Sequence, residues 1–183
     1  PGRQHTPTPR EEAYQNALRV IREAAGEAYI LACGAPILPS LKFCDGIRIG
    51  TDVTPYWINT PLSTWLSNPN NPSTQNAIRT CIHRQWLRPL IHLDPDAAYF
   101  RARHTTLTAS QKQLLSDLAL VSGFKVSSDL PQWLTPKELN ELRAFLESNP
   151  AIEQVDAYRY RADGREIDFS PAISIPLPNR LPV

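Results

Sequence analysis

Several features that define large protein classes are scarce or missing in this sequence of 183 residues. It has only 3 cysteines, an odd number at irregular spacing, which excludes a disulfide framework as the basis of the fold. The formal net charge of +1 provides no strong field to attract nucleic acid or an anionic membrane. No apolar run approaches the roughly 20 residues of a membrane-spanning helix, and the first residues lack a secretory h-region. We therefore expect no nucleic-acid partner, no membrane association and a cytoplasmic location.

Methionine is absent altogether, and position 1 is a proline. Because translation starts with methionine, we expect a trimmed chain or a piece of a longer protein. Hydrophobic residues nevertheless make up 42% of the chain, which is enough to form a packed core.

Short motifs of well-known enzyme classes are also missing. The chain has no G-x-S-x-G nucleophile elbow, no G-x-G-x-x-G turn and no phosphate-binding P-loop. Cys81 and His83 form a C-x-H pair, but no C-x-x-C or H-x-x-x-H accompanies it to complete a zinc site. His83 and His92 fall within an expected helix and an expected strand, where histidine is more often structural than catalytic. We expect neither a metal ion nor a cofactor.

Capping residues and apolar periodicity predict four helices. Thr8-Pro9-Arg10-Glu11 and Thr135-Pro136-Lys137-Glu138 each place a hydroxyl at the N-cap, proline at the first helical position and a carboxylate at the third. Thr108 with Gln111 opens another helix, which Gly123 closes. In chain order, the predicted helices span residues 9–25, 72–87, 109–122 and 136–146.

Short apolar runs between these helices predict buried parallel strands, because each run is apolar on both faces. Strands that alternate with helices indicate an α/β protein with a parallel sheet. Four strands are half of a (β/α)₈ barrel of about 250 residues, so we expect the C-terminal half of such a TIM barrel, strands 5–8. The runs are Ala28–Cys33, Ile47–Gly50, Leu90–Leu93 and Phe124–Ser127.

The pattern changes after residue 150. Residues 155–161 alternate between apolar and polar, Asp163-Gly164 is a hairpin turn signal, and residues 165–169 can form the returning strand. The proline-containing tail that follows reads as extended chain. We predict a division into the half-barrel, 1–150, and the beginning of a small antiparallel β module, 151–183.

The segment Asp45–Val53 carries the most informative polar residues. A short strand delivers Arg48 and then, after Gly50, Asp52 at its C-terminal end, where barrel enzymes keep their catalytic groups. From the pattern alone two interpretations stay open. Both side chains face a cleft, or Asp52 is a turn aspartate that forms a salt bridge with Arg48.

The stretch YILACGAPILPSLKFCDGIRIGTDVTPYW, residues 29–57, resembles the melibiase-type α-galactosidases of glycoside hydrolase family 36 and their relatives. In that superfamily a cysteine or similar residue ends the fifth strand, and an arginine shortly before an aspartate ends the sixth. Cys33, Arg48 and Asp52 match these positions. The resemblance implies that Arg48 contacts sugar hydroxyls and that Asp52 is the general acid/base. The proline usual before that aspartate is Thr51 here.

A second block supports the resemblance. Leu93-Asp94-Pro95-Asp96-Ala97 is similar to the Asn-Asp-Pro-Asp segment of the seventh strand, and Ser128-Asp129-Leu130 follows at the eighth. Leu93 replaces the family asparagine, so the contact made by that amide is in question. For Asp94 and Asp96, two roles stay open, a structural carboxylate at a strand end or a contact in a sugar subsite.

Aromatic residues occupy the long segment after the expected sixth strand. Trp57 and Trp65 lie there, and exposed aromatic rings in that position can stack on sugar faces. Packing of the same rings against the barrel rim is the alternative. The substrate-binding candidates are Arg48, Cys33, Trp57 and Asp96.

The resemblance implies a retaining glycoside hydrolase that cleaves terminal α-galactosides by double displacement. The family nucleophile is an aspartate in a Lys-x-Asp context at the end of the fourth strand, and no such strand end occurs in these 183 residues. We expect this chain to supply the acid/base Asp52, and a companion N-terminal half-barrel segment of the same protein to supply the nucleophile, so that the chain alone is inactive. The alternative is a non-catalytic carbohydrate-binding module or a degenerate barrel fragment.

Overall fold

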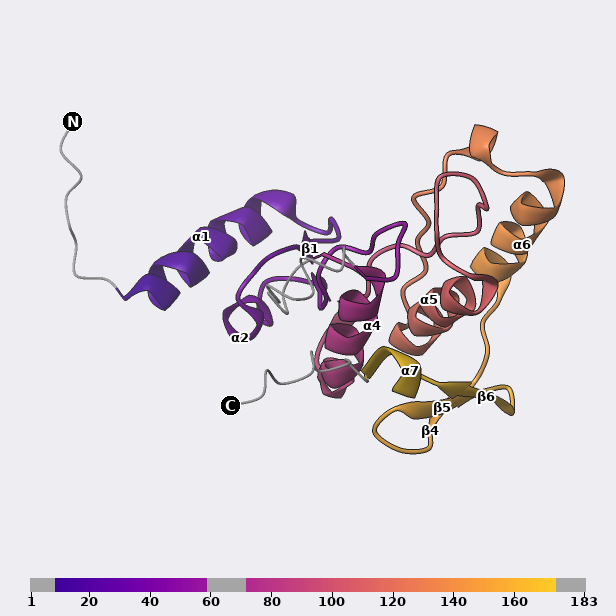
Figure 1. The fold of residues 1–183 in the computed structure, drawn as a ribbon. Coiled ribbons are helices and arrows are strands. Elements are labelled where there is room, and N and C mark those ends of the chain that lie inside the picture. Colours follow the sequence, from indigo (N-terminus) through magenta and orange to yellow (C-terminus); the bar gives the residue numbers. More distant parts are fainter. Residues whose placement is uncertain (1–8, 59–71, 174–183) are drawn as a thin grey trace, which may run out of the picture.

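The computed structural model describes residues 9–58 and 72–173 (Figure 1). Its helices and strands belong to an α/β protein with one parallel and one separate antiparallel sheet, which confirms the α/β part of the prediction. The α-helices are α1 (Arg10–Ala25), α2 (Ile37–Ser40), α4 (Thr74–His83), α5 (Ala109–Ser122), α6 (Pro136–Glu147) and α7 (Ser170–Ile173), with 3₁₀ turns η1 (Gln85–Leu87) and η2 (Pro131–Trp133).

The parallel sheet has the order β1 (Leu31–Ala32), β2 (Gly46–Arg48) and β3 (His92–Asp94). The strands are shorter than the apolar runs that predicted them. In place of the predicted fourth strand at 124–127, the structure has an isolated parallel bridge between Ala98 and Ser127. Asp96 has a φ of 77°, and this interruption of the extended backbone separates β3 from the bridge. The half-barrel itself remains a prediction.

A close approach joins the end of β2 to α4. A Cβ added at Gly50 would lie 2.5 Å from the Sγ atom of Cys81 and 3.3 Å from the carbonyl oxygen of Ala77. Only glycine therefore fits where the chain leaves β2 beneath this helix. Ile47, Ile49 and Cys81 are fully buried and belong to the hydrophobic core of the molecule.

The antiparallel sheet has the order β4 (Ile152–Gln154), β5 (Arg159–Ala162) and β6 (Arg165–Asp168). Asp163 and Gly164 join β5 to β6 with positive φ angles of 46° and 82°, which confirms the predicted hairpin turn. Figure 1 shows this sheet beside α5, and Arg165 from β6 donates to both carboxylate oxygens of Asp117 in that helix. Phe169, which follows β6, is fully buried. The boundary at residue 150 stays a prediction.

Local capping chemistry is confirmed at two helices. The hydroxyls of Thr108 and Thr135 each accept a backbone N–H three residues later, and Gln111 and Glu138 return the bond to complete a capping box. Gly123 ends α5 in the left-handed conformation, with a φ of 77°.

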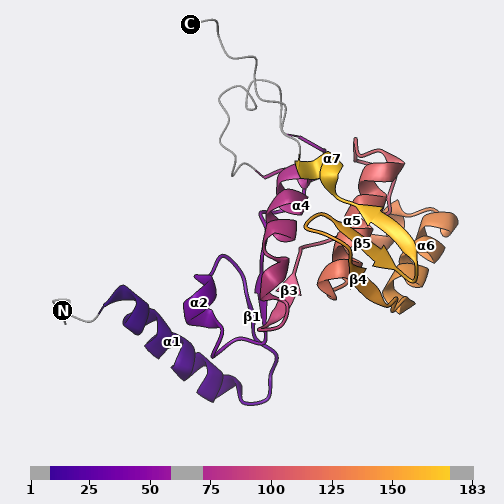
Figure 2. The ribbon, with the colours of Figure 1, turned by 90° about the horizontal axis from the view of Figure 1, so that it is seen from below.

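Two helix starts differ from the prediction. Helix α4 begins at Thr74, because the hydroxyl of Ser73 accepts the N–H of Asn76, and it ends at His83 before a 3₁₀ turn. Helix α1 begins at Arg10 with Pro9 at the N-cap, one residue later than predicted. The predicted capping residues Thr8 and Asn71 lie outside the described residues. Figures 1 and 2 place α1 and α6 at opposite ends of the molecule.

Candidate functional site

Polar side chains meet at the carboxyl-terminal edge of the parallel sheet. Arg48 ends β2 and Asp94 ends β3, and the two are register partners on neighbouring strands. Asp52 and Asp96 follow these strands, and Cys33 follows β1. Because the carboxyl ends of parallel strands meet at one edge, a set of residues far apart in sequence is gathered here.

Arg48 is the centre of this group and faces three carboxylates. Its Nε donates to Asp94 Oδ2 over 2.8 Å, and its Nη2 lies 3.2 Å from Asp96 Oδ1. Its Nη1 lies 3.5 Å from Asp52 Oδ1. The side chain of Asp94 is 3% exposed and that of Asp52 is 78% exposed. The guanidinium thus links a buried carboxylate to an exposed one.

Burial and charge oppose one another in this cluster. Burial disfavours the charged form of Arg48 and acts to lower its pKa. The hydrogen bond to Asp94 and the charge of Asp96 outweigh this effect, so the pKa of Arg48 is raised. Burial also raises the pKa of Asp96, although the N–H of Val53 and the charge of Arg48 favour its ionised form. The arginine is therefore a permanent cation at this edge.

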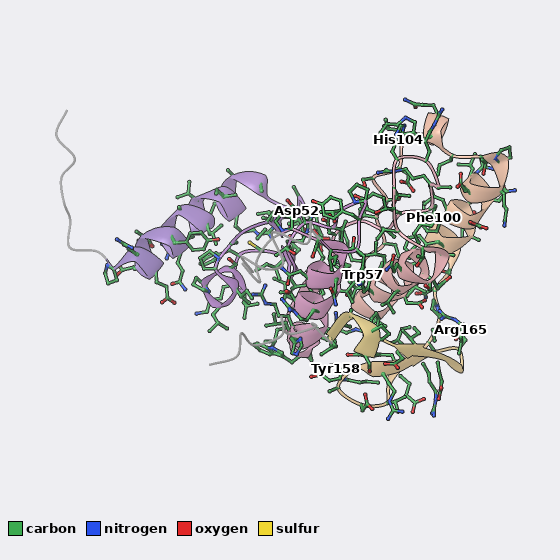
Figure 3. The ribbon with its side chains drawn as sticks, viewed as in Figure 1. Asp52, Trp57, Phe100, His104, Tyr158 and Arg165 are labelled. Atoms are coloured by element: carbon green, nitrogen blue, oxygen red, sulfur yellow. The ribbon has the colours of Figure 1, made fainter. Side chains whose placement is uncertain are left out.

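The backbone around Asp52 is held on both sides. The carbonyl of Ile49 accepts from Nη1 of Arg84 over 2.8 Å, and the N–H of Val53 donates to Asp96 Oδ2 over 2.8 Å. Thr54 exchanges two hydrogen bonds with the side chain of Thr74 at the start of α4. Asp52, labelled in Figure 3, consequently extends an exposed carboxylate from a fixed segment.

The other predicted site residues, Cys33 and Trp57, have different surroundings. Cys33 is an exposed free thiol that directly follows β1 at the same edge of the sheet as Arg48. Trp57 is half-buried and packs against the hydrophobic core, and its carbonyl accepts the N–H of Gln75 in α4 over 3.0 Å. In Figure 3 its side chain lies beside α4. Trp65 lies outside the described residues.

A second buried ion pair, between Arg101 and Asp129, had no assigned role at the level of sequence. The carboxylate of Asp129 is fully buried and accepts from Nη1 of Arg101 and from the N–H groups of Phe100 and Arg101. The guanidinium of Arg101 lies 4.5 Å from the ring centroid of Tyr99 and 5.0 Å from that of Trp133. In the sequence, the position of Asp129 after an expected strand was the one feature that could have drawn attention to it. Its pairing with Arg101 is visible only in the folded structure.

Within residues 9–58 and 72–173, no group of three or more histidine, cysteine, aspartate or glutamate side chains is placed to hold a metal ion. None of the helices in the described part of the chain is long and apolar enough to cross a membrane.

A cavity of about 490 Å³ lies between α5 and α6. Its lining includes Lys112, Glu141 and Phe145 but none of the residues around Arg48. Nζ of Lys112 already donates to the carbonyl oxygens of Phe100 and Arg101. The cavity is therefore separate from the candidate site at the sheet edge.

No protein-family model matches this chain. It is similar to the α-galactosidase TtGalA from Thermus thermophilus in two solved structures. With the complex of that enzyme with p-nitrophenyl α-D-galactopyranoside, the identity is 45% and the TM-score 0.84, over 88% of this chain and 34% of the enzyme. With its stachyose complex, the identity is 49% and the TM-score 0.71, over 74% of this chain and 30% of the enzyme. The chain thus spans about a third of the length of the enzyme that it matches.

Proposed function

We propose that this chain, which fits a fragment of an α-galactosidase, carries the general acid/base of a retaining glycoside hydrolase that acts on terminal α-galactosides. The observation that carries the proposal is the position of Asp52. It is an exposed carboxylate on a held segment at the carboxyl edge of a parallel sheet, within 3.5 Å of Arg48. Catalytic groups of α/β barrels occupy this edge.

In the proposed mechanism the reaction has two steps. A carboxylate outside this chain attacks the anomeric carbon, and Asp52 protonates the departing glycosidic oxygen. In the second step Asp52 removes a proton from the water that releases the sugar. The two carboxyl groups of a retaining enzyme lie roughly 5–5.5 Å apart, so the companion segment has to place its nucleophile at that distance from Asp52.

Arg48 has two tasks in this proposal. Its fork of N–H groups sets the direction of the Asp52 carboxylate, and its partly exposed edge is available to a sugar hydroxyl. Its side chain is 18% exposed, so it reaches the surface without losing its buried carboxylate partners. Cys33 is the neighbouring candidate for substrate contact, and Trp57 a candidate for stacking on a sugar ring.

The same proposal includes the architecture and the partner. We take β1, β2, β3 and the segment that bridges at Ser127 as strands five to eight of a (β/α)₈ barrel, in that order. The side of β1 that faces away from β2 then receives a strand of the companion N-terminal half-barrel. The bound p-nitrophenyl galactoside and stachyose of the Thermus thermophilus enzyme support an α-galactoside as the substrate.

The test is the Asp52→Ala variant of the complete α-galactosidase that contains this segment. It should lose activity on galactosides with poor leaving groups by roughly 10²–10⁴-fold, because those substrates need protonation. An activated aryl galactoside should still form the glycosyl-enzyme, and turnover should then stall because the base is missing. Azide needs no base, so adding it should restore turnover and yield an α-galactosyl azide.

The Asp52→Asn variant is the matched control for shape, since it keeps the size of the side chain and removes only its proton chemistry. It should behave as Asp52→Ala does with both substrates. Equal slowing of good and poor leaving groups, with no effect of azide, would favour the non-catalytic alternative, a turn aspartate paired with Arg48.

A further inference from the structure

We propose that Asp96 is a positioning residue that fixes the orientation of Asp52 from the neighbouring strand end. Its two carboxylate oxygens have different partners. Oδ2 accepts the N–H of Val53 over 2.8 Å, and Oδ1 lies 3.2 Å from Nη2 of Arg48. Val53 directly follows Asp52, and Arg48 contacts the Asp52 carboxylate. Asp96 therefore restrains both the backbone and the side-chain partner of Asp52. This inference rests on the proposed function.

The backbone at Asp96 is built for this contact. Its φ of 77° is uncommon for a residue other than glycine, and aspartate adopts it more readily than most because its short side chain bonds locally. The N–H of Asp96 donates to Asp94 Oδ1 over 2.8 Å, which fixes the turn. The left-handed backbone thus directs the carboxylate of Asp96 back across β2. A conformation of this kind persists only when the surrounding contacts determine it.

Charge provides a second link between Asp96 and Asp52. Arg48 is a single cation shared among three carboxylates, and two of them, Asp94 and Asp96, are largely buried. When Asp96 loses its charge, Arg48 is less neutralised and attracts the Asp52 carboxylate more strongly. A general acid that is held ionised gives up its function at a lower pH. The titratable and charged groups that surround this arginine from the neighbouring elements are Cys33, Asp52, Cys81, Arg84, Asp94 and Asp96.

The experiment compares Asp96→Ala and Asp96→Asn in the complete α-galactosidase. Asp96→Ala removes both contacts, so kcat on a substrate with a poor leaving group should fall on the order of 10-fold or more, with KM nearly unchanged. Asp96→Asn keeps an oxygen for Val53 but removes the charge. Its kcat at the optimum should fall less, and the alkaline limb of its kcat–pH profile should move to lower pH.

Asp45 offers a matched control at the opposite end of β2. It too accepts a backbone N–H, that of Ile30 at 2.7 Å, and pairs with an arginine, Arg22, at 2.5 Å. Asp45→Asn and Asp45→Ala should change stability without altering the leaving-group dependence or the pH profile. If the Asp45 variants reproduce the Asp96 profile, the effect is general destabilisation and the positioning role is wrong.

Amide hydrogen exchange at Val53 tests the contact without using activity. The Val53 N–H should exchange faster in Asp96→Ala and stay protected in Asp96→Asn. A raised KM with unchanged kcat would instead make Asp96 a sugar contact, and unchanged kinetics with a fast amide would make it structural only. If Asp52→Ala retains full activity, the proposed function fails, and with it the role of Asp96. If Asp52→Ala behaves as proposed and Asp96→Ala does not, only the present inference is overturned.

Discussion

Arg48 and Asp94 are paired twice, as register partners of β2 and β3 and as an ion pair of 2.8 Å between Nε and Oδ2. The buried carboxylate holds the inner edge of the guanidinium, and the Nη groups are thereby directed toward Asp96 and Asp52. The ladder between two short strands thus sets the direction of a charged group at the sheet edge.

In the proposed complete α-galactosidase, Arg48→Ala should lower kcat/KM by a factor that corresponds to at least about 2 kcal/mol of transition-state stabilisation, because a charged hydrogen-bond partner is lost. The substitution also leaves the buried Asp94 carboxylate without its cationic partner, which destabilises the fold. The double variant Arg48→Ala, Asp94→Asn removes this unpaired charge and should recover stability without recovering activity. Steady-state kinetics and thermal melting separate the two effects. Full catalytic efficiency in the folded double variant would make Arg48 a structural ion-pair partner alone.

Arg48→Lys should recover little of the activity lost in Arg48→Ala. Lysine keeps the charge, but it has no planar fork to contact Asp52, Asp94 and Asp96 together. The measurement is kcat/KM with a poor leaving group, at a pH where both variants are folded. Arginine-like activity in Arg48→Lys would show that charge alone is sufficient at this position.

Expressed alone, residues 1–183 should form oligomers or aggregates. Tyr29 and Leu31 are exposed at β1, which ends the described parallel sheet, and an unpaired edge with apolar side chains recruits other chains. Co-expression with the proposed companion half-barrel segment should yield a soluble complex. Size-exclusion chromatography and thermal melting provide the measurement. A monomer of the isolated chain that melts cooperatively would contradict the companion half-barrel.

Gly50→Ala should destabilise the complete protein by roughly 1–3 kcal/mol, the usual range for overpacking. The added methyl would meet Cys81 at 2.5 Å, inside a fully buried contact. In a double-mutant cycle, Cys81→Ala should absorb part of that loss, because it removes the sulfur atom in the way. Denaturant unfolding of the four proteins measures the coupling. Strict additivity of the two changes would mean that the backbone, and not the sulfur, sets the requirement for glycine.

The free energy of unfolding should respond to pH in opposite directions at Asp45 and Asp96. The N–H of Ile30 and the guanidinium of Arg22 lower the pKa of Asp45, so its contribution is present above about 3.9, the unfolded value, and is lost as the pH falls through the folded value. Burial raises the pKa of Asp96, so its folded carboxyl binds a proton more readily than the unfolded one. The free energy of unfolding therefore falls as the pH rises from the unfolded-state pKa of Asp96 to its higher folded-state pKa.

The measurement is the melting temperature of Asp45→Asn and Asp96→Asn relative to the wild type, over the acidic pH range in which the two carboxyl groups ionise. The amount by which Asp45→Asn melts below the wild type should grow as the pH rises. The difference for Asp96→Asn should move the other way, in favour of the variant, and then level off. Parallel curves for the two variants would contradict the opposite pKa shifts.

Features that depend only on neighbouring residues could be predicted from the sequence. The capping boxes at Thr108 and Thr135 form within one helical turn, and the hairpin at Asp163-Gly164 needs only two residues with positive φ. The alternation of apolar runs and helices likewise predicted the α/β class. The resemblance in two short blocks of the sequence also indicated α-galactosidases, and the similarity to the Thermus thermophilus enzyme confirms it.

Contacts between residues far apart along the chain depend on the tertiary fold. Asp94 and Asp96 lie 46 and 48 positions from Arg48, and the β2–β3 register brings all three together. The same holds for Arg101 and Asp129, whose ion pair joins two segments across the bridge at Ser127. The apolar runs also predicted strands that are longer than the observed ones. An extended segment can be buried on both faces and still make few hydrogen bonds to a neighbouring strand. Strand pairing depends on partners distant along the chain, and no local pattern contains that information.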